Sequence, residues 1–182
     1  MLRSALPCMR HRPACGGRGF TLIQLMIYTT VLAILCGIGV PALQQTLVQM
    51  RADALRMQLV TVLNNARNTA ISRRMRIDAC ATHDGRTCSK DWARGWLIYP
   101  GKLKSDDRPL DQTPLRAVRV EYRGITAPHT GGRATVQFRP DGRMAGLNQT
   151  IRICVRGVAR KAVKVNIAGR VRSVRLKKPE RC

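Results

Sequence analysis

The first strong pattern along the chain is a long apolar run near its N-terminus. The thirty-two residues between Arg18 and Arg51 contain no Asp, Glu, Lys, Arg or His. A helix that crosses the roughly 30 Å hydrocarbon core of a bilayer needs about 20 mostly apolar residues, and residues 20–41 supply them. A secretory signal peptide has a shorter apolar core followed by a small-residue cleavage site, and a buried core helix rarely avoids charge for so long. The pattern therefore predicts a transmembrane helix over residues 20–41.

A helical pattern continues beyond the apolar run. Apolar residues recur there at spacings of three and four, which indicates one apolar face of an amphipathic helix. The members of this face are Ala52, Leu55, Leu59, Val62, Leu63, Ala66 and Ala70. We therefore predict a single helix from about Phe20 to about Ser72. Residues 42–74 form its amphipathic extension, which packs on a globular domain.

The remainder of the chain, residues 75–182, has the pattern of β-strands. Short β-branched runs are separated by turn signals at Pro140-Asp141-Gly142, Arg156-Gly157 and Ala168-Gly169. The predicted strands cover residues 96–99, 117–122, 135–138, 151–155, 163–167 and 170–176, with a polar loop at 102–114. Several runs alternate apolar and polar residues, as strands do when one face is buried. We predict an antiparallel sheet laid against the long helix, so the fold class is α+β.

The apolar run is preceded by a short basic segment. Arg3, Arg10, Arg12 and Arg18 lie in it with no acidic residue among them. Because basic residues stay on the cytoplasmic side of a membrane helix, the N-terminus is expected in the cytoplasm and the C-terminal domain in the periplasm. The chain is thus expected to cross the inner membrane once.

Residues 18–26, Arg-Gly-Phe-Thr-Leu-Ile-Gln-Leu-Met, resemble the prepilin motif of type IV pilins and type II secretion pseudopilins. The resemblance implies that a prepilin peptidase cuts after Gly19, removing residues 1–19, and methylates the new amine of Phe20. Pro41 matches a helix-kinking proline of these families. Gln24 stands where the family usually has a glutamate that pairs with a neighbouring subunit. Members without this glutamate tend to sit at a filament tip, so the resemblance implies a minor, tip-associated subunit.

Cysteine usage fits export of the C-terminal domain. Cys8 and Cys15 belong to the leader and Cys36 lies in the apolar run. The remaining four, in a segment that faces an oxidising periplasm, are Cys80, Cys88, Cys154 and Cys182. Four cysteines allow three connectivities, between which the sequence cannot choose. We favour a local Cys80–Cys88 bridge and a Cys154–Cys182 bridge that ties down the tail. No Cys-x-x-Cys occurs, so a zinc site is disfavoured.

No constellation of residues points to catalysis. His11, His83 and His129 are isolated in the sequence, and Asp106 and Asp107 lie in a polar loop. Gly131-Gly132-Arg133 lacks the following helix that a phosphate-binding loop needs. We therefore expect no enzymatic activity, no metal and no cofactor.

The charge of the chain is strongly positive. Four of the 33 Lys and Arg residues lie in the leader, so 29 remain against 10 acidic residues, a formal +19. From Arg143 onward there are twelve basic residues and only Glu180 opposes them. A domain with so much unpaired charge suits a polyanionic partner, whose phosphates Lys and Arg bind without sequence preference. A generally basic proteome, or attraction to anionic lipid headgroups, is the alternative interpretation.

The C-terminal half sharpens the resemblance. Residues 65–71, 95–99, 138–143 and 169–172 occur in an order similar to FimT/GspH-type minor pilins, and most like FimT. FimT-type members capture extracellular DNA in natural transformation through a C-terminal Gly-Arg-x-Arg motif, which Gly169, Arg170 and Arg172 match. Two residues apart, the arginines project from one face of a strand, and their planar guanidinium groups suit bidentate phosphate contact. The full candidate set is Gly169, Arg170, Arg172, Arg175, Lys177, Lys178, Arg160, Lys161 and Lys164.

The expected function is a minor type IV pilin that binds double-stranded DNA non-specifically and aids its uptake. Its other partners would be the inner membrane, other pilins and the prepilin peptidase. Two alternatives share the same membrane helix. One is a GspH-like pseudopilin of type II secretion with protein partners, and the other is a minor pilin that only primes pilus assembly.

Overall fold

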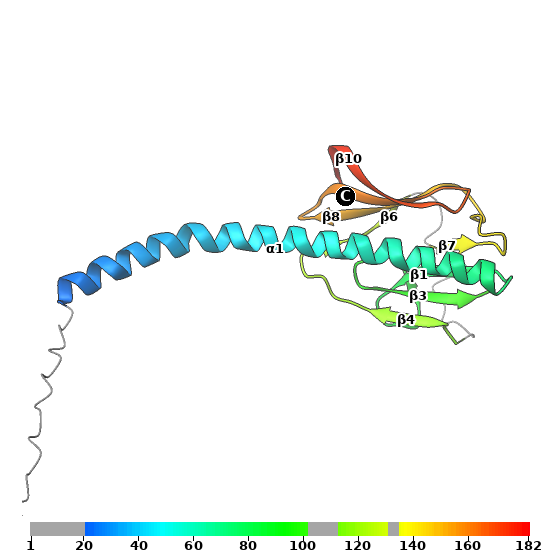
Figure 1. The fold of residues 1–182 in the computed structure, drawn as a ribbon, viewed down its shortest axis with the longest axis horizontal. Helices are drawn as coiled ribbons and strands as arrows, with labels where there is room; N and C mark the ends of the chain where they lie inside the picture. Colours follow the sequence, from blue (N-terminus) through cyan, green and yellow to red (C-terminus); the bar gives the residue numbers. More distant parts are fainter. Residues whose placement is uncertain (1–20, 102–112, 131–134) are drawn as a thin grey trace, which may run out of the picture. The chain divides into compact units, whose positions relative to one another are not determined.

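The computed structural model describes residues 21–101, 113–130 and 135–182 (Figure 1). The predicted leader 1–19, the processing residues Gly19 and Phe20, and most of the predicted loop at 102–114 lie outside these ranges. The described elements are α1 (Leu22–Ser72), β1 (Ile77–Thr82), β2 (Cys88–Ser89), β3 (Gly95–Pro100), β4 (Arg116–Arg119), β5 (Ile125–Thr126), β6 (His129–Thr130), β7 (Thr135–Phe138), β8 (Gln149–Val155), β9 (Val158–Val165) and β10 (Val171–Arg181).

The chain forms two compact units, Met1–Ala42 and Leu43–Cys182, and the second is called the head below. In the first unit, α1 begins with a reciprocal cap. The Thr21 backbone N–H donates to Gln24 Oε1 at 3.1 Å, and the Gln24 N–H donates to Thr21 Oγ1 at 3.4 Å. Such a capping box satisfies two backbone donors that the first helical turn leaves free. Gln24 therefore has a local structural use in this chain.

The apolar side chains of α1 in the first unit are exposed, among them Leu22, Ile34 and Ile38. By length and composition α1 is apolar enough to cross a membrane. This property is consistent with membrane anchoring through the N-terminal helix.

In the head, α1 buries one face. Its buried residues are Ala52, Leu55, Leu59, Val62, Leu63, Ala66 and Ala70, which confirms the predicted apolar face. The helix ends at Ser72, as predicted, and Arg74 adopts a positive φ of 49° just after it. The Met75 N–H then donates to Ala70 O and the Arg74 N–H to Ile71 O, a Schellman motif that satisfies the last helical carbonyls.

The strands form two antiparallel five-stranded sheets instead of the single predicted sheet. One has the order β2-β1-β3-β4 with β7 also paired to β1, and the other has the order β10-β9-β8-β5 with β6 also paired to β8. One core cluster contains residues from α1 and from both sheets. The α+β class is confirmed. The sequence did not predict β1, because all six of its residues are buried and their pattern does not alternate.

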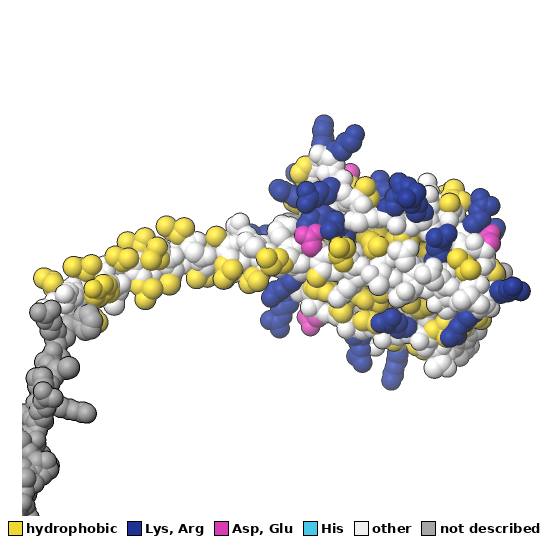
Figure 2. Space-filling view, viewed as in Figure 1, with side chains coloured by type: hydrophobic (Ala, Val, Ile, Leu, Met, Phe, Trp, Pro, Cys, Tyr) yellow, Lys and Arg dark blue, Asp and Glu magenta, His cyan; other side chains and the backbone are white. Residues whose placement is uncertain are grey.

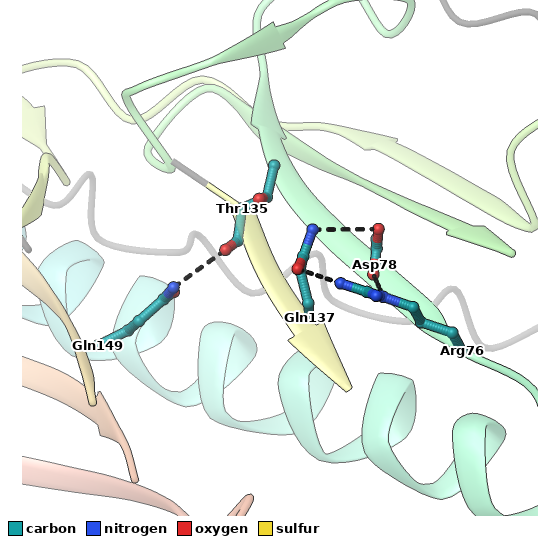
Figure 3. A network of polar contacts seen from close by, with 5 residues as sticks. All are labelled: Arg76, Asp78, Thr135, Gln137 and Gln149. Atoms are coloured by element: carbon teal, nitrogen blue, oxygen red, sulfur yellow. Dashed lines mark hydrogen bonds and ion pairs between the residues drawn. The ribbon is translucent and has the colours of Figure 1, made fainter. Parts of the chain in front are cut away.

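Buried polar contacts lie within one sheet and also between the two sheets (Figure 3). The buried Asp78 accepts hydrogen bonds from Arg76 Nε at 3.3 Å and from Gln137 Nε2 at 3.4 Å, and Arg76 also donates to Gln137. Gln149 on β8 donates to the Thr135 carbonyl on β7 at 3.1 Å. Buried polar groups need such partners to avoid a desolvation penalty, and the Gln149 hydrogen bond links one sheet to the other.

Two disulfides tie down loops of the head. Cys80 is bonded to Cys88 between β1 and β2, and Cys154 on β8 is bonded to Cys182. The Cys182 N–H donates to the Gly157 carbonyl at 3.1 Å. The end of β10 is thereby held beside the turn between β8 and β9. The described free cysteine is Cys36.

Candidate nucleic-acid interface

The candidate residues lie on a long antiparallel hairpin of β9 and β10. Compared with the predicted strands, β9 begins earlier, at Val158, and ends at Val165, while β10 continues to Arg181. A register shift separates Arg175 from Glu180, and Pro179 lies within it. Because β10 is an edge strand and its pairing with β9 is irregular at this point, a proline that lacks an N–H is tolerated there.

The turn between β9 and β10 contains residues that were predicted to lie in a strand. Asn166 Oδ1 accepts the Arg170 N–H at 2.8 Å, and the Gly169 N–H donates to the Asn166 carbonyl at 2.8 Å. Asn side chains favour turns because they bond nearby backbone in this way. Asn166 and Ile167, predicted as strand, therefore belong to the turn.

Gly169 is a structural residue of this turn. Its φ is 76°, it is buried, and a Cβ built on it would lie 1.9 Å from the Gly142 carbonyl oxygen. Arg67 on α1 donates from Nε to the same oxygen at 3.0 Å. Any side chain at this position would meet backbone that cannot move aside. Gly169 therefore sets the position of the following arginines and does not itself face a ligand.

Lys164 and Arg172 form an exposed pair of like charges. They stand directly opposite each other in the β9–β10 register. Like charges directly opposite in a sheet are destabilising. Arg170, directly before β10, is also exposed, and its carbonyl accepts the Asn166 N–H at 3.2 Å. Lys164, Arg170 and Arg172 are called the far group below, and within the described ranges their own side chains make no hydrogen bond or ion pair.

Lys161, by contrast, is already paired. Its Nζ lies 2.7 Å from Asp53 Oδ2 on α1, and only 14% of its side chain is exposed. Arg56 also contacts Asp53 at 3.3 Å and donates to Ser173 Oγ on β10 at 2.8 Å. The hydrogen bond from Lys161 holds the pKa of Asp53 below its ordinary value. These contacts attach the hairpin to the helix and remove Lys161 from the residues free to bind a ligand.

The remaining candidates lie at the other half of the hairpin. Arg160, Arg175 and Lys177 line a groove of about 430 Å³ together with Gln49 of α1, and Lys178 is exposed beside them. We call these the near group, which consists of Arg160, Arg175, Lys177 and Lys178. Arg170 and Lys178 are eight residues apart, which corresponds to at most roughly 26 Å along a strand. The candidate set is therefore a strip with two ends rather than one compact patch.

Positive charge on the head is not confined to the hairpin. Figure 2 shows Lys and Arg side chains around β10 and also along the opposite edge of the head, with few acidic side chains between them. Three exposed arginines that sequence reasoning left out of the candidate set are Arg51, Arg123 and Arg156. Their positions far apart in the sequence gave no sign that Arg51 and Arg123 would line one hollow.

Titratable groups elsewhere in the described residues do not converge on a reactive site. Burial lowers the pKa of His129 and raises the pKa of Tyr99 to about 12. Backbone hydrogen bonds from Thr87 and Arg86 lower the pKa of Asp84 in the loop closed by Cys80 and Cys88. Among the described residues no cluster of three His, Cys, Asp or Glu could hold a metal.

The fold and the sequence are both similar to known proteins. A family model described as type II transport protein GspH matches residues 43–169. The type IV minor pilin FimU of Pseudomonas aeruginosa PAO1 is similar in two crystal forms. One is 24% identical with a TM-score of 0.55, covering 75% of this chain and 95% of that chain. The other is 25% identical with a TM-score of 0.53, covering 72% and 96%. A search of curated proteins found no match.

These matches bear on the resemblance read from the sequence. The narrower likeness to FimT stays a prediction, since neither match names that protein. The GspH match covers most of the chain, and the FimU structures share its long helix and antiparallel sheets. The chain therefore belongs to the GspH family of type IV pilin-like minor pilins and pseudopilins.

Proposed function

We propose that this protein is a minor type IV pilin that binds double-stranded DNA non-specifically through the far group and aids DNA uptake in natural transformation. The observation that carries the proposal is the exposed pair of Lys164 and Arg172, with Arg170 beside it and no acidic partner among the described residues. An arrangement that repels itself in the free protein is relieved when a polyanion binds.

Physical chemistry supports DNA as the ligand. Each phosphate that Lys or Arg neutralises releases a condensed counterion, which makes such binding strong at low salt and indifferent to sequence. A guanidinium group can contact a phosphate through two parallel hydrogen bonds. A strip of roughly 26 Å spans about eight phosphates of one strand at 3.4 Å each. The near group could extend the contact along the duplex, with the far group as its centre.

The proposal includes the processing and location expected from the sequence. A prepilin peptidase would cut after Gly19, and residues 20–41 would remain in the inner membrane with the head on the periplasmic side. From there the subunit would join other pilins in a filament. The two disulfides of the head support an oxidising compartment.

A second candidate function is supported by the family match. The family model is described as a type II transport protein, so a pseudopilin that contacts protein partners in type II secretion would fit the same fold. A minor pilin that only primes pilus assembly would fit it as well. Neither role calls for the self-repelling far group, and DNA binding therefore discriminates among the three.

The test is an electrophoretic mobility shift with the full-length protein in nanodiscs of zwitterionic lipid, over a series of salt concentrations. We expect duplexes of unrelated sequence to bind equally and log affinity to fall linearly with log salt. Replacing both Arg170 and Arg172 with Gln should reduce the salt slope by about 1.8, since each lost phosphate contact removes about 0.9. Affinity should fall by roughly tenfold or more.

A matched control removes two exposed arginines from the other sheet, Arg116 and Arg119 on β4. This variant loses the same net charge, so it reports any effect of charge alone. Equal affinity of the far-group and control variants would reject the site. Absence of binding by the wild-type protein at low salt would reject the DNA function. In a competent host, transformation frequency should fall for the Arg170/Arg172 variant only.

A further inference from the structure

We propose that the head carries a second basic surface, which binds the anionic phospholipid surface of the membrane in which the protein is anchored. Its residues, called the collar, are Arg51, Arg123, Arg156, Arg160 and Lys177. The proposal rests on the membrane anchor of the proposed function and not on DNA binding. Arg160 and Lys177 belong to the near group, so the collar gives these residues a ligand other than DNA.

The collar cations lie around the first turns of α1 in the head. Arg156 and Arg160 line a groove of about 580 Å³ with Gln49 of α1, and Lys177 lines a groove that also contains Gln49. Arg51 and Arg123 line a separate hollow of about 280 Å³. At 3.6 residues per turn, positions 49 and 51 point to nearly opposite sides of a helix. Collar cations therefore lie on opposite sides of the same two turns.

This arrangement favours a planar partner, such as a membrane surface, over a rod-shaped one, such as a DNA duplex. A duplex lying against the head meets one side of α1 and leaves the cations of the other side free. A surface that the helix axis crosses meets both sides at once. The segment that carries Arg123 is held to the helix, since Tyr122 donates its hydroxyl to Gln58 Oε1 at 2.9 Å. The collar is thus built on fixed elements.

Arg156 supplies an independent observation. It has a φ of 51° in the two-residue turn before Gly157, whose φ is 78°. Such turns favour Asn, Asp or Gly at the first position, and a residue with a long side chain there is uncommon. Strained residues of this kind cluster where function requires them. Arg156 is exposed and lines its groove together with apolar Val155 and Val158.

A mixture of apolar and basic side chains suits the boundary of a bilayer. Long basic side chains there hold their charge among the phosphates while apolar groups reach toward the acyl chains. Val158 and Leu47 are both partly exposed at this end of the head, by 37% and 42%. The groove lining therefore has the composition of an interfacial contact.

The position of the collar in the chain brings it close to a membrane. Val40 ends the predicted membrane run, and Gln49 follows only nine residues later in the chain, a tether of at most roughly 32 Å. Headgroups extend about 5–7 Å beyond the hydrocarbon core on each side. The collar is thus within reach of phosphates that the chain itself keeps nearby.

Acidic residues near the collar are few. Asp53 is already paired with Lys161 and Arg56, and Glu121 lines the hollow of Arg51 and Arg123. Glu180 is paired with Arg152 at 2.9 Å. Five collar cations therefore face one unpaired acidic side chain among the residues that the structure describes, so the collar keeps a strong positive charge.

The test uses hydrogen exchange on the full-length protein in nanodiscs of phosphatidylcholine alone or of an equal mixture with phosphatidylglycerol. We expect amides of residues 155–158 to exchange several-fold more slowly in the anionic discs, because each cation near such a surface strengthens attraction by about fivefold. Raising the salt concentration should abolish the difference. Identical exchange in the two kinds of disc would overturn the proposal and would leave the proposed DNA binding unaffected.

Variants separate the collar from the far group. The collar variant carries Arg51→Gln, Arg123→Gln and Arg156→Asn, the three collar cations outside the candidate DNA-binding set, with Asn chosen because it tolerates positive φ. The control removes three other exposed arginines, through Arg116→Gln, Arg170→Gln and Arg172→Gln. The collar variant should lose the lipid protection and keep DNA binding, and the control should do the reverse. Equal loss of protection in both variants, or loss of DNA binding in the collar variant with unchanged lipid protection, would reject the proposal.

Discussion

The two ends of the β9–β10 hairpin use positive charge in opposite ways. At the far end the backbone is fixed by the contact of Gly169 with Gly142, and the cations Lys164 and Arg172 stay without acidic partners. Toward the near end Lys161 is paired with Asp53, Arg152 is paired with Glu180, and a disulfide holds the tail. The comparison teaches that net charge alone does not identify a binding surface. What matters is which cations the fold leaves without partners.

The largest effect is expected from a substitution that distorts the turn between β9 and β10, at the far end of the hairpin. Gly169→Ala places a Cβ at 1.9 Å from the Gly142 oxygen and forces a side chain into positive φ. We expect unfolding free energy to fall by about 2–5 kcal/mol from strain and overpacking together. DNA affinity should fall with it, because Arg170 and Arg172 lose their fixed position. Chemical denaturation and the mobility shift measure the two effects.

Gly157→Ala at the near end is the matched control. Gly157 has almost the same φ, 78°, but a Cβ there meets nothing within 4 Å. Only the backbone penalty of about 1–2 kcal/mol is expected, with DNA affinity unchanged. Equal stability of the two alanine variants would show that the close approach of Gly169 to Gly142 adds nothing to the loss of unfolding free energy.

A smaller effect is expected from a charge reversal at the far end, which should change the stability of the fold and the affinity for DNA in opposite directions. Arg172→Glu replaces a like-charge pair with an opposite-charge pair across from Lys164. We expect the fold to gain about 0.5–1 kcal/mol from the new cross-strand pair while DNA affinity drops, since the ligand now meets a carboxylate. Thermal unfolding and the mobility shift would then move in opposite directions. A variant that lost stability as well would show that the repulsion is not felt in the free protein.

The smallest predicted effect tests the pairing at the near end. The Lys161 hydrogen bond lowers the pKa of Asp53 below 3.8. A carboxylate with a lowered folded pKa contributes stability above its unfolded pKa and loses it as the pH falls through the folded value. Because Asp53 is 44% exposed, the coupling should stay below about 1 kcal/mol. A double-mutant cycle of Asp53→Asn and Lys161→Met should show the coupling at about pH 6, and the coupling should shrink as the pH falls below 3.8.

DNA binding gives that cycle an internal check. Lys161 is largely buried by its ion pair, so its removal should leave affinity for duplexes unchanged at neutral pH. A large loss of affinity in Lys161→Met would mean that the pair opens when DNA binds and that the near half of the hairpin joins the interface.

Much of the fold could be predicted from local sequence patterns. The 3.6-residue periodicity identified the buried face of α1 residue by residue, because burial on a helix follows spacing directly. The strand over Thr135–Phe138 was placed at its observed bounds. The division into two sheets could not be predicted, since it depends on long-range pairing. β1 lies between β3 on one side and β2 and β7 on the other, and nothing local in Ile77–Thr82 indicates this.

The candidate site, like the fold, could be predicted only where it depends on local sequence patterns. The hairpin and the juxtaposition of its cations follow from turn residues and alternation, which are local. The pairing of Lys161 with Asp53 joins residues 108 positions apart, and the contact of Gly169 with Gly142 joins two separate turns. These two contacts determine whether Lys161 and Gly169 are available to a ligand, and both exist only in the folded structure. The arginines of the collar come from three segments and could be grouped only in three dimensions.

The open edge of β10 has a consequence for how the molecule behaves in crowded solutions. An uncovered strand of this length is a template onto which another chain can add, which is how soluble sheets begin to aggregate. Lys177, Lys178 and Pro179 on this edge oppose such addition by charge repulsion and by a missing N–H. The cations that attract a polyanion therefore also keep neighbouring heads apart. Neutralising them should make the protein less soluble even where its fold is unchanged.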